Sequence, residues 1–260
     1  MFDSGFGGLT VARAVLDLLP AEHLVYLGDT GRYPYGPRAL GEVRGFARQI
    51  SRYLLDRHRA KCLVVACNTA SAAALDVLRE EVEVPVLGVI EPGVRALVSA
   101  TRNGRVGVIA TVGTVASGAY QRAVAAMGAD VDLTCAACPG FVEFVERGET
   151  TSDQVHVLAE RLLDPVRRAG VDALLLGCTH YPFLARTISD VVGRDVVLVS
   201  SADETAFELQ ALLTTAGLAR PPAAGVGCHR FLSSGDVAWF ESLGRRMLGP
   251  ELGPVEPVVW

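Results

Sequence analysis

Lysine is almost absent from this sequence, and its scarcity argues against one large class of cofactor chemistry. Lys61 is the only lysine among 260 residues, and it stands before an apolar run instead of at the end of one. Enzymes that use pyridoxal phosphate hold the cofactor on a lysine as a Schiff base. A pyridoxal phosphate mechanism is therefore not expected, and no other cofactor is indicated.

Metal and nucleic-acid sites are also poorly supported by the composition. The five histidines, at positions 23, 58, 156, 180 and 229, lack the paired spacing of zinc ligands. A formal net charge of −5 leaves no basic surface of the kind that binds phosphate backbones. We therefore expect neither a bound metal nor a nucleic-acid partner.

Long hydrophobic runs and dense cysteines are missing as well. The apolar runs, such as residues 174–178, are far shorter than the roughly 20 residues that cross a bilayer. Six cysteines in so long a chain do not form the pattern of secreted disulfide scaffolds, and no signal peptide is apparent. We expect a cytoplasmic protein with reduced thiols and no membrane partner.

Short apolar runs alternate with helical patterns along the chain. This alternation is typical of the α/β class, in which strand–helix–strand units build a mainly parallel sheet. Apolar side chains at three- and four-residue intervals predict helices at residues 39–57 and 153–168, and residues 254–260 are expected to form a loose tail. Strands are expected at residues 24–28, 62–67, 84–90, 105–110, 132–137, 172–177 and 196–201.

The two halves of the chain resemble each other weakly. A loop feeds a helix at residues 2–15, and a strand end feeds a helix at residues 109–124. An apolar run then ends in a cysteine in each half: Cys67 comes 64 residues after Asp3, and Cys178 comes 67 residues after Thr111. Repeated strands and small turns also occur in any α/β chain. If the repeat is real, it predicts two similar lobes that face each other across a cleft.

Cys67 and Cys178 are the leading candidates for catalysis. Each follows an apolar run, and ligands of open parallel sheets bind at the carboxyl ends of the strands. A buried thiol is more often a small apolar side chain, but two thiols at equivalent places favour a functional role. Two acid/base groups on opposite faces of a carbon can remove a proton from one side and return it to the other, and a thiol can be tuned toward neutral pH.

Several polar residues near these cysteines are candidate substrate ligands or acid/base partners. Asn68, Thr69, Thr179 and Ser4, with backbone N–H groups at helix starts, are suitable donors to carboxylates. His180 can adjust the protonation of the adjacent thiol or be a structural histidine. Asp3 can cap a helix, orient an ammonium group or assist the Cys67 thiol.

Three further patterns carry less information. The glycine- and proline-rich residues 28–38 form a shaped loop, in which Tyr35 and Gly36 either line a pocket or make a plain turn. Cys135 and Cys138 form one CxxC pair without the partners that zinc or redox sites need. Residues 5–8 lack the full glycine pattern of a dinucleotide loop and suit a carboxylate-binding or tight turn.

Together these motifs resemble those of the glutamate racemase family. The segments DSGFGGLTV, GDTGRYPYGPR, ACNTAS, GVIEPG, GVIATVGT, CPGFVEFVERG and GCTHYP occur in the family's order, between Asp3 and about Thr205. The resemblance implies cofactor-independent exchange of L- and D-glutamate for peptidoglycan synthesis. It also implies two α/β lobes with the active site between them: residues 1–91 with 203–260 carrying Cys67, and residues 92–202 carrying Cys178.

The same resemblance implies roles for individual residues. Cys67 and Cys178 match the catalytic pair, and Glu146 matches an acidic residue that assists catalysis. In related aspartate racemases the second cysteine is followed by Thr-Glu, so the Thr-His found here favours glutamate. The substrate-binding positions of the family match Asp3, Ser4, Tyr35, Gly36, Asn68, Thr69, Thr179 and His180, of which Asp3 and His180 are also expected to assist the thiols.

Some expectations and alternatives go beyond this assignment. Relatives carry several residues ahead of the DSG motif that form a first strand, so we expect the short start at Met1 and Phe2 to cost stability. A homodimer is expected. One enzymatic alternative is another two-cysteine racemase. The other is a single-cysteine decarboxylase or isomerase of the same superfamily, and the presence of two cysteines argues against this one. A gyrase-inhibiting role is known among relatives, but nothing in this sequence encodes such an interface.

Overall fold

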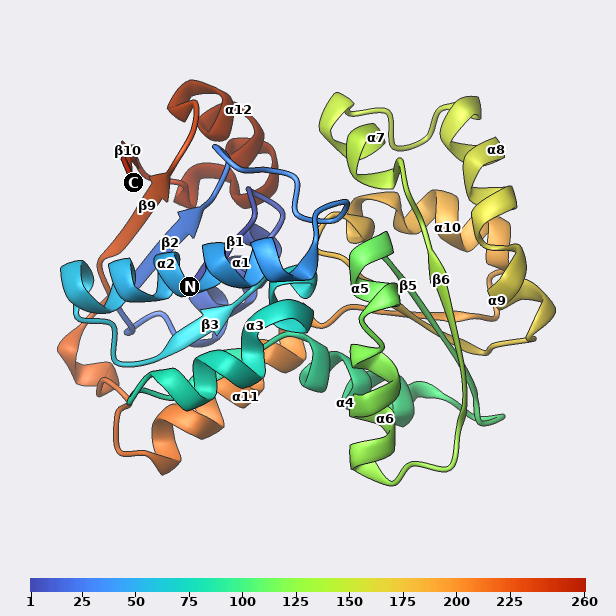
Figure 1. Cartoon of the computed structure of the whole chain (residues 1–260), viewed down its shortest axis with the longest axis horizontal. Coiled ribbons are helices and arrows are strands. Elements are labelled where there is room, and N and C mark those ends of the chain that lie inside the picture. Colours follow the sequence, from blue (N-terminus) through green and yellow to red (C-terminus); the bar gives the residue numbers. More distant parts are fainter. The chain divides into compact units, whose positions relative to one another are not determined.

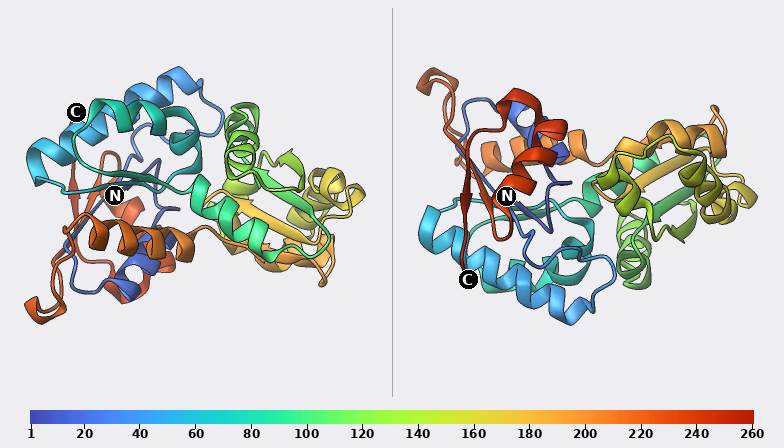
Figure 2. Two further views of the ribbon diagram at one scale, coloured as in Figure 1. Left: turned by 90° about the horizontal axis from the view of Figure 1, so that it is seen from below. Right: turned by 90° about the horizontal axis from the view of Figure 1, so that it is seen from above.

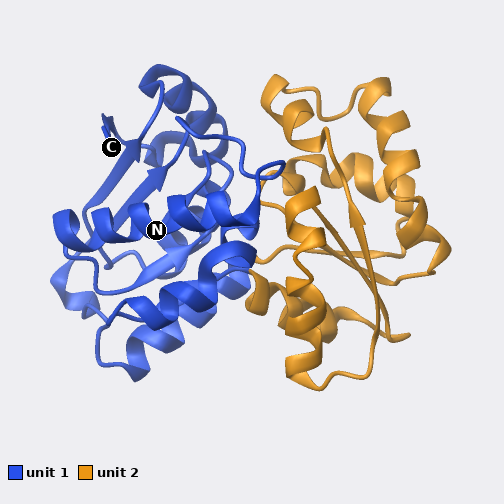
Figure 3. Cartoon of the chain, in the orientation of Figure 1, with its two compact units in different colours: residues 1–89, 202–260 blue, residues 90–201 orange.

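The computed structural model describes residues 1–260, which divide into two compact units. Unit 1 contains Met1–Val89 and Ala202–Trp260, and unit 2 contains Ile90–Ser201 (Figure 3). Each unit has its own sheet, with six strands in unit 1 and four in unit 2, and every strand pair is parallel. The expected α/β class with parallel sheets is therefore confirmed. None of the helices is long and apolar enough to cross a bilayer.

Unit 1 is a parallel sheet with helices on both faces (Figures 1 and 2). Its strands lie in the order β10-β9-β2-β1-β3-β4. The strands are β1 (Phe2–Asp3), β2 (Leu24–Gly28), β3 (Leu63–Val65), β4 (Val86–Gly88), β9 (His229–Ser233) and β10 (Val255–Pro257). The helices are α1 (Leu9–Leu18), α2 (Leu40–His58), α3 (Asn68–Glu81), α11 (Ala202–Thr215) and α12 (Val237–Leu248).

Alternating side chains of the strands build two cores in unit 1. Tyr26 and Val64 pack on the face covered by α1, α11 and α12, whereas Leu27, Leu63 and Val65 pack on the face covered by α2 and α3. Successive residues of a strand point to opposite faces of its sheet, so a strand buried on both faces is apolar throughout. This explains why the expected strands are continuous apolar runs.

Unit 2 is a smaller unit of the same kind. Its strands lie in the order β6-β5-β7-β8. The strands are β5 (Arg105–Ala110), β6 (Asp132–Ala137), β7 (Ala173–Gly177) and β8 (Val197–Val199). The helices are α4 (Ile90–Ala100), α5 (Val112–Ala116), α6 (Ala119–Met127), α7 (Phe141–Arg147), α8 (Asp153–Leu162), α9 (Asp164–Arg168) and α10 (Ala185–Val192), with a 3₁₀ turn at Tyr181–Leu184.

The two sheets share one arrangement of strands. The order β2-β1-β3-β4 in unit 1 corresponds to β6-β5-β7-β8 in unit 2, and unit 1 adds β9 and β10 beside β2. In each unit the first strand in the chain pairs with the strand that leads to the candidate cysteine: β1 pairs with β3, and β5 pairs with β7. The weak sequence repeat therefore corresponds to a structural repeat.

Two expectations about local structure were wrong, and one strand was not predicted. The segment expected as a tail contains β10, which pairs with β9 from Val255↔Phe231 onward. The single helix expected at residues 153–168 is two helices, α8 and α9, because Pro165 lies in the first turn of α9 and lacks the N–H that would continue α8. Strand β9 was not expected, since its sequence HRFLS begins with two polar residues.

Candidate active site

The first candidate thiol lies at the carboxyl edge of the unit 1 sheet. Strand β1 ends at Asp3, and its neighbour β3 ends two residues before Cys67. The Ala66 N–H donates to the Phe2 carbonyl oxygen at 2.8 Å, which holds the two strand ends together. The Cys67 thiol consequently lies 3.8 Å from Ser4 Oγ.

Asp3 and Ser4 form the turn beside this thiol. The Asp3 carboxylate accepts a hydrogen bond from the Gly5 N–H at 2.7 Å and lies 3.4 Å from Ser4 Oγ. Asp3 is fully buried, and it does not cap α1, whose N-cap residue is Gly8. A buried negative charge next to Cys67 is therefore part of the site.

The environment of Cys67 favours its neutral thiol. The pKa of Cys67 is raised to about 12, mainly by burial and also by the negative charge of Asp3, against the lowering effect of hydrogen bonds from Ala70 and Ser4. A positive charge placed next to Asp3 would offset that repulsion, since an opposite charge nearby favours the ionised form of an acid. A cation bound beside Asp3 would therefore lower the pKa of the Cys67 thiol.

Helix α3 begins directly after Cys67 and brings Asn68 and Thr69 to the same edge. Both residues are buried and occupy its first turn. The first N–H groups of a helix have no partner within the helix, and the helix dipole favours anions at this end. This turn is a suitable binding place for a carboxylate.

The loop after β2 brings Tyr35 into the same apolar core as Cys67. The Tyr35 side chain is buried, and its hydroxyl donates a hydrogen bond to the Asp29 carboxylate. Gly36, in the turn that follows, is half-buried. Asp29 is a further buried residue at this edge of the sheet, and its signal in the sequence is a charged residue directly after a buried strand.

The second candidate thiol lies at the carboxyl edge of the unit 2 sheet. Cys178 directly follows β7, and Cys178, Thr179 and His180 are all buried. The Cys178 sulfur lies 3.9 Å from His180 Nδ1. The structure thus brings the second cysteine and its histidine together, two residues apart in the chain.

Glu146 continues this arrangement from the neighbouring helix α7. Its Oε1 atom lies 4.0 Å from Nε2 of His180. Burial lowers the pKa of His180 to about 4 and raises the pKa of Glu146 to about 7. At neutral pH the imidazole is uncharged and the carboxyl group is close to half protonated, so the pair is a set of proton donors and acceptors and not a fixed ion pair.

The remaining cysteines do not join either site. All six cysteines are without disulfide bonds, and no group of three or more His, Cys, Asp or Glu side chains is placed to hold a metal ion. Cys135 lies in β6, and Cys138 follows β6, where its carbonyl oxygen accepts a hydrogen bond from the Tyr181 hydroxyl at 3.0 Å. The CxxC pair has a structural place in unit 2.

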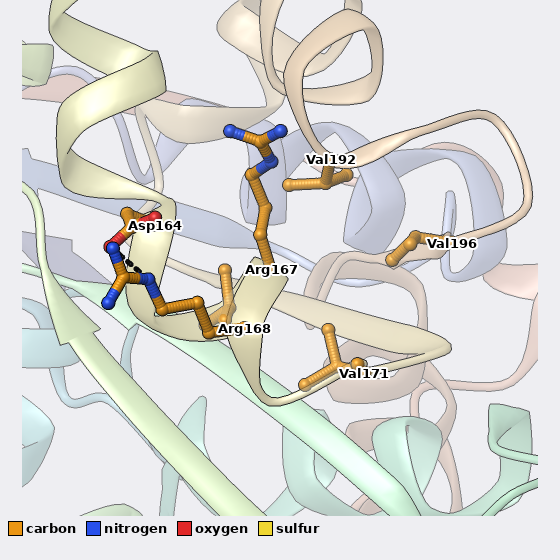
Figure 4. Close-up of a pocket in the computed structure, with 8 residues that line it drawn as sticks. Asp164, Arg167, Arg168, Val171, Val192 and Val196 are labelled. Carbon is orange, nitrogen blue, oxygen red and sulfur yellow. Dashed lines mark ion pairs between the residues drawn. The ribbon is translucent and has the colours of Figure 1, made fainter.

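Two surface hollows lie at the amino ends of the strands, opposite the carboxyl edges that carry Cys67 and Cys178. The hollow in unit 2 is next to Val171, which precedes β7, and contains the ion pair of Arg168 with Asp164 at 2.9 Å (Figure 4). The hollow in unit 1 is next to Met1 and Cys62, which precede β1 and β3. Neither is lined by the candidate cysteines.

The fold and the two thiol sites define a class of protein: an α/β enzyme in which each of two parallel sheets presents a buried cysteine beside a carboxylate or histidine. Residues 8–208 match the family model described as Asp/Glu/hydantoin racemase. The chain belongs to this family, and it is a racemase, which is a kind of isomerase.

Individual relatives cover almost the whole chain. A glutamate racemase of Acidothermus cellulolyticus is 55% identical over 98% of this chain and 96% of its own length. Among solved structures, a glutamate racemase isoform of Bacillus anthracis is 40% identical with a TM-score of 0.93, covering 99% of this chain and 95% of that one. A glutamate racemase of Francisella tularensis, solved with D-glutamate, is 32% identical with a TM-score of 0.91 and the same coverage.

Proposed function

We propose that this protein interconverts L- and D-glutamate without a cofactor, by a two-base mechanism that uses Cys67 and Cys178. The observation that carries the proposal is that each sheet ends in a buried cysteine with its own polar partner, Ser4 and Asp3 in unit 1 and His180 in unit 2. Relatives named glutamate racemase, one of them solved with D-glutamate, support the choice of substrate.

Racemisation requires one acid/base group on each face of the α-carbon. A thiolate removes the α-proton from one face and becomes a thiol, while the thiol on the other face gives its proton to the carbanion and becomes a thiolate. Cys67 takes the proton from D-glutamate and Cys178 takes it from L-glutamate. Product release leaves the two sulfurs in exchanged protonation states, ready for the reverse reaction.

In this proposal the substrate's own charges prepare the first thiol. The ammonium group binds beside Asp3 and offsets the charge that raises the pKa of Cys67. A carboxylate of the substrate binds at the first turn of α3, next to Asn68 and Thr69. Hydrogen bonds to that carboxylate spread the negative charge that develops when the α-proton leaves.

In the second unit His180 and Glu146 serve the other thiol. The neutral imidazole, 3.9 Å from the Cys178 sulfur, accepts or donates the proton that the thiol exchanges. Glu146, with its pKa near 7, stabilises the imidazole when it is protonated. Thr179 supplies a hydroxyl for the substrate, and Tyr35 and Gly36 close the first unit's part of the site.

A cofactor-free assay tests the proposal. Purified protein, dialysed against a chelator, is incubated with L- or D-glutamate in D₂O, and proton NMR follows loss of the α-hydrogen signal while chiral chromatography follows inversion. We expect both substrates to exchange their α-hydrogen for deuterium and to invert at the α-carbon. A requirement for added pyridoxal phosphate or metal would refute the proposal, and faster turnover of aspartate than of glutamate would change the substrate.

The proposed physiological role is the supply of D-glutamate for peptidoglycan in the cytoplasm. Rescue of a D-glutamate auxotroph by this protein tests that role.

A further inference from the structure

The loop from Asp29 to Ala39 is anchored by one buried carboxylate. Asp29 follows β2 directly and is fully buried, and its backbone N–H donates to the Asp3 carbonyl oxygen at 3.0 Å. Its carboxylate accepts hydrogen bonds from Arg32 Nε at 2.7 Å, from Ser234 Oγ at 2.5 Å and from the Tyr35 hydroxyl. Asp29 thus joins Arg32 and Tyr35 of the loop to Ser234 through its side chain, and joins the loop to the strand end that carries Asp3 through its backbone.

Arg32, the charged partner of Asp29, lies over two aromatic rings. Its guanidinium carbon lies 4.3 Å from the centre of the Phe46 ring and 4.4 Å from the centre of the Trp260 ring. Trp260 also packs edge-on against Tyr53, with ring centres 5.8 Å apart. Contacts with two aromatic rings limit the freedom of the guanidinium that meets the carboxylate.

The C-terminal part of the chain supplies more contacts to the same loop. Ser234, which follows β9, accepts a hydrogen bond from the Gly31 N–H at 3.1 Å in addition to its bond with Asp29. Thr30 Oγ1 lies 2.6 Å from Ser233 Oγ. The Val258 N–H donates to the Ser233 carbonyl oxygen at 2.8 Å, which links the segment ending at Trp260 to this contact.

The Tyr35 side chain connects Asp29 with the buried core around Cys67. The Tyr35 ring belongs to the buried cluster that contains Cys67, and the Tyr35 hydroxyl is directed to Asp29. Without the Asp29 carboxylate, the Arg32 and Tyr35 donors would lose their charged partner. Leaving such buried or half-buried groups unpaired has a large cost in free energy, and a shift of the loop would reduce that cost. The position of Tyr35 in the core that contains Cys67 therefore depends on Asp29.

We propose that Asp29 is a positioning residue for the reaction, and that the C-terminal segment from β10 to Trp260 holds the Asp29–Arg32 pair so that Tyr35 stays in the buried core that contains Cys67. This inference rests on the proposed function for the identity of the substrate. It assigns the C-terminal segment a part in substrate binding, although that segment contains none of the candidate catalytic residues.

Substitution of Trp260 tests the proposal by a split between KM and kcat. In Trp260→Ala the Arg32 guanidinium loses one of its two aromatic contacts, and we expect KM for glutamate to rise roughly three- to tenfold with kcat within about twofold. Trp260→Phe keeps an aromatic face and should restore KM. Asp29→Asn should raise KM by roughly tenfold or more, because a charged hydrogen-bond partner is lost.

A matched control separates positioning from general loosening of the C-terminal segment. Glu256 in β10 forms a two-point ion pair with Arg230 of β9, at 2.6 and 2.9 Å, and neither residue touches the loop. Glu256→Gln should leave KM unchanged. The proposal is overturned if KM in Trp260→Ala stays within twofold of the unsubstituted protein, or if Glu256→Gln raises KM as much as Trp260→Ala does.

A second measurement does not depend on the substrate. Cys67 is only 6% exposed, and a displaced loop would open it to iodoacetamide, with the labelled peptide quantified by mass spectrometry. We expect faster labelling of Cys67 in Trp260→Ala than in the unsubstituted protein and in Glu256→Gln. If the unsubstituted protein fails to racemise glutamate, the proposed function fails, while equal labelling rates in all three proteins would overturn the positioning role.

Discussion

The Cys67 sulfur accepts a hydrogen bond from the Ala70 N–H at 3.4 Å, at the start of α3. The candidate base is therefore also the N-cap residue of a helix. This bond and the helix dipole favour the thiolate, whereas burial and Asp3 oppose it. The ionisation of Cys67 is therefore set by a balance that a bound ammonium group can shift.

The two cysteines should divide the faces of the substrate. Serine in place of either cysteine leaves one thiol and puts a much weaker acid on the other side, since a hydroxyl does not ionise near neutral pH as a thiol does. Racemisation should fall by at least about a hundredfold in both directions. Elimination from a β-substituted glutamate analogue needs one base only, so Cys67→Ser should still process the L-analogue and Cys178→Ser the D-analogue.

Serine is the appropriate substitution at position 67 because it is also a good N-cap. Cys67→Ser should retain the hydrogen bond to the Ala70 N–H, whereas Cys67→Ala should lose about 1 kcal/mol of stability with the cap. Melting curves of both variants are the control. Equal loss of both enantiomers in both serine variants would contradict the division of faces, and near-normal racemisation in either variant would remove that cysteine from the mechanism.

Glu146 should make the stability of the protein depend on pH. Burial raises its pKa from 4.5 to about 7 in the folded chain, so between these values the folded state binds more protons than the unfolded state. Its contribution to stability is therefore lost as pH rises through this window. Glu146→Gln removes this dependence, and the variant should gain in Tm relative to the unsubstituted protein between pH 5 and pH 8.

The activity of the same variant provides a second check on Glu146. Burial lowers the pKa of His180 to about 4, so the imidazole stays neutral in the folded protein above that pH. Any change of rate near pH 7 should then follow Glu146 and disappear in Glu146→Gln. A rate profile that keeps its step near pH 7 in the variant would assign the step to another group.

Gly8 should tolerate no side chain, in contrast to Gly45. A Cβ atom on Gly8 would lie 2.6 Å from the Asp3 Cβ and 2.8 Å from the Tyr26 hydroxyl oxygen, so Gly8→Ala should displace Asp3 and cost about 1–3 kcal/mol. Gly45 lies in α2, where a Cβ atom would meet no other atom within 4 Å. Gly45→Ala should stabilise the protein by about 0.5–1 kcal/mol.

Thermal unfolding and steady-state rates of the two glycine variants provide the test. Gly45→Ala should raise Tm and leave activity unchanged. Gly8→Ala should lower Tm and also reduce kcat/KM in the molecules that remain folded, since Asp3 contributes to the charge beside Cys67. Full activity in folded Gly8→Ala would show that the position of Asp3 is unimportant.

The sequence by itself determined the class of fold and the position of the two thiols. The strands at Leu24–Gly28, Arg105–Ala110 and Asp132–Ala137 have the bounds that their patterns predicted. A strand buried on both faces is a short apolar run, and polar residues follow it at the carboxyl end where ligands bind. The strand and its polar turn can therefore both be recognised from residues that are neighbours in the sequence. Cys67 and Cys178 were found because they occupy that boundary.

Only the tertiary structure decided which distant residues meet. The pairing of β9 with β2, the 4.0 Å approach of Glu146 to His180, and the bond from Ser234 to Asp29 join residues that are far apart in the chain. Local patterns carry no information on such pairs, because the free energy that forms them comes from burial and hydrogen bonding available only once the sheets are assembled. The tail from residue 254 became a strand for this reason: its partner β9 supplies backbone hydrogen bonds that no local pattern could reveal.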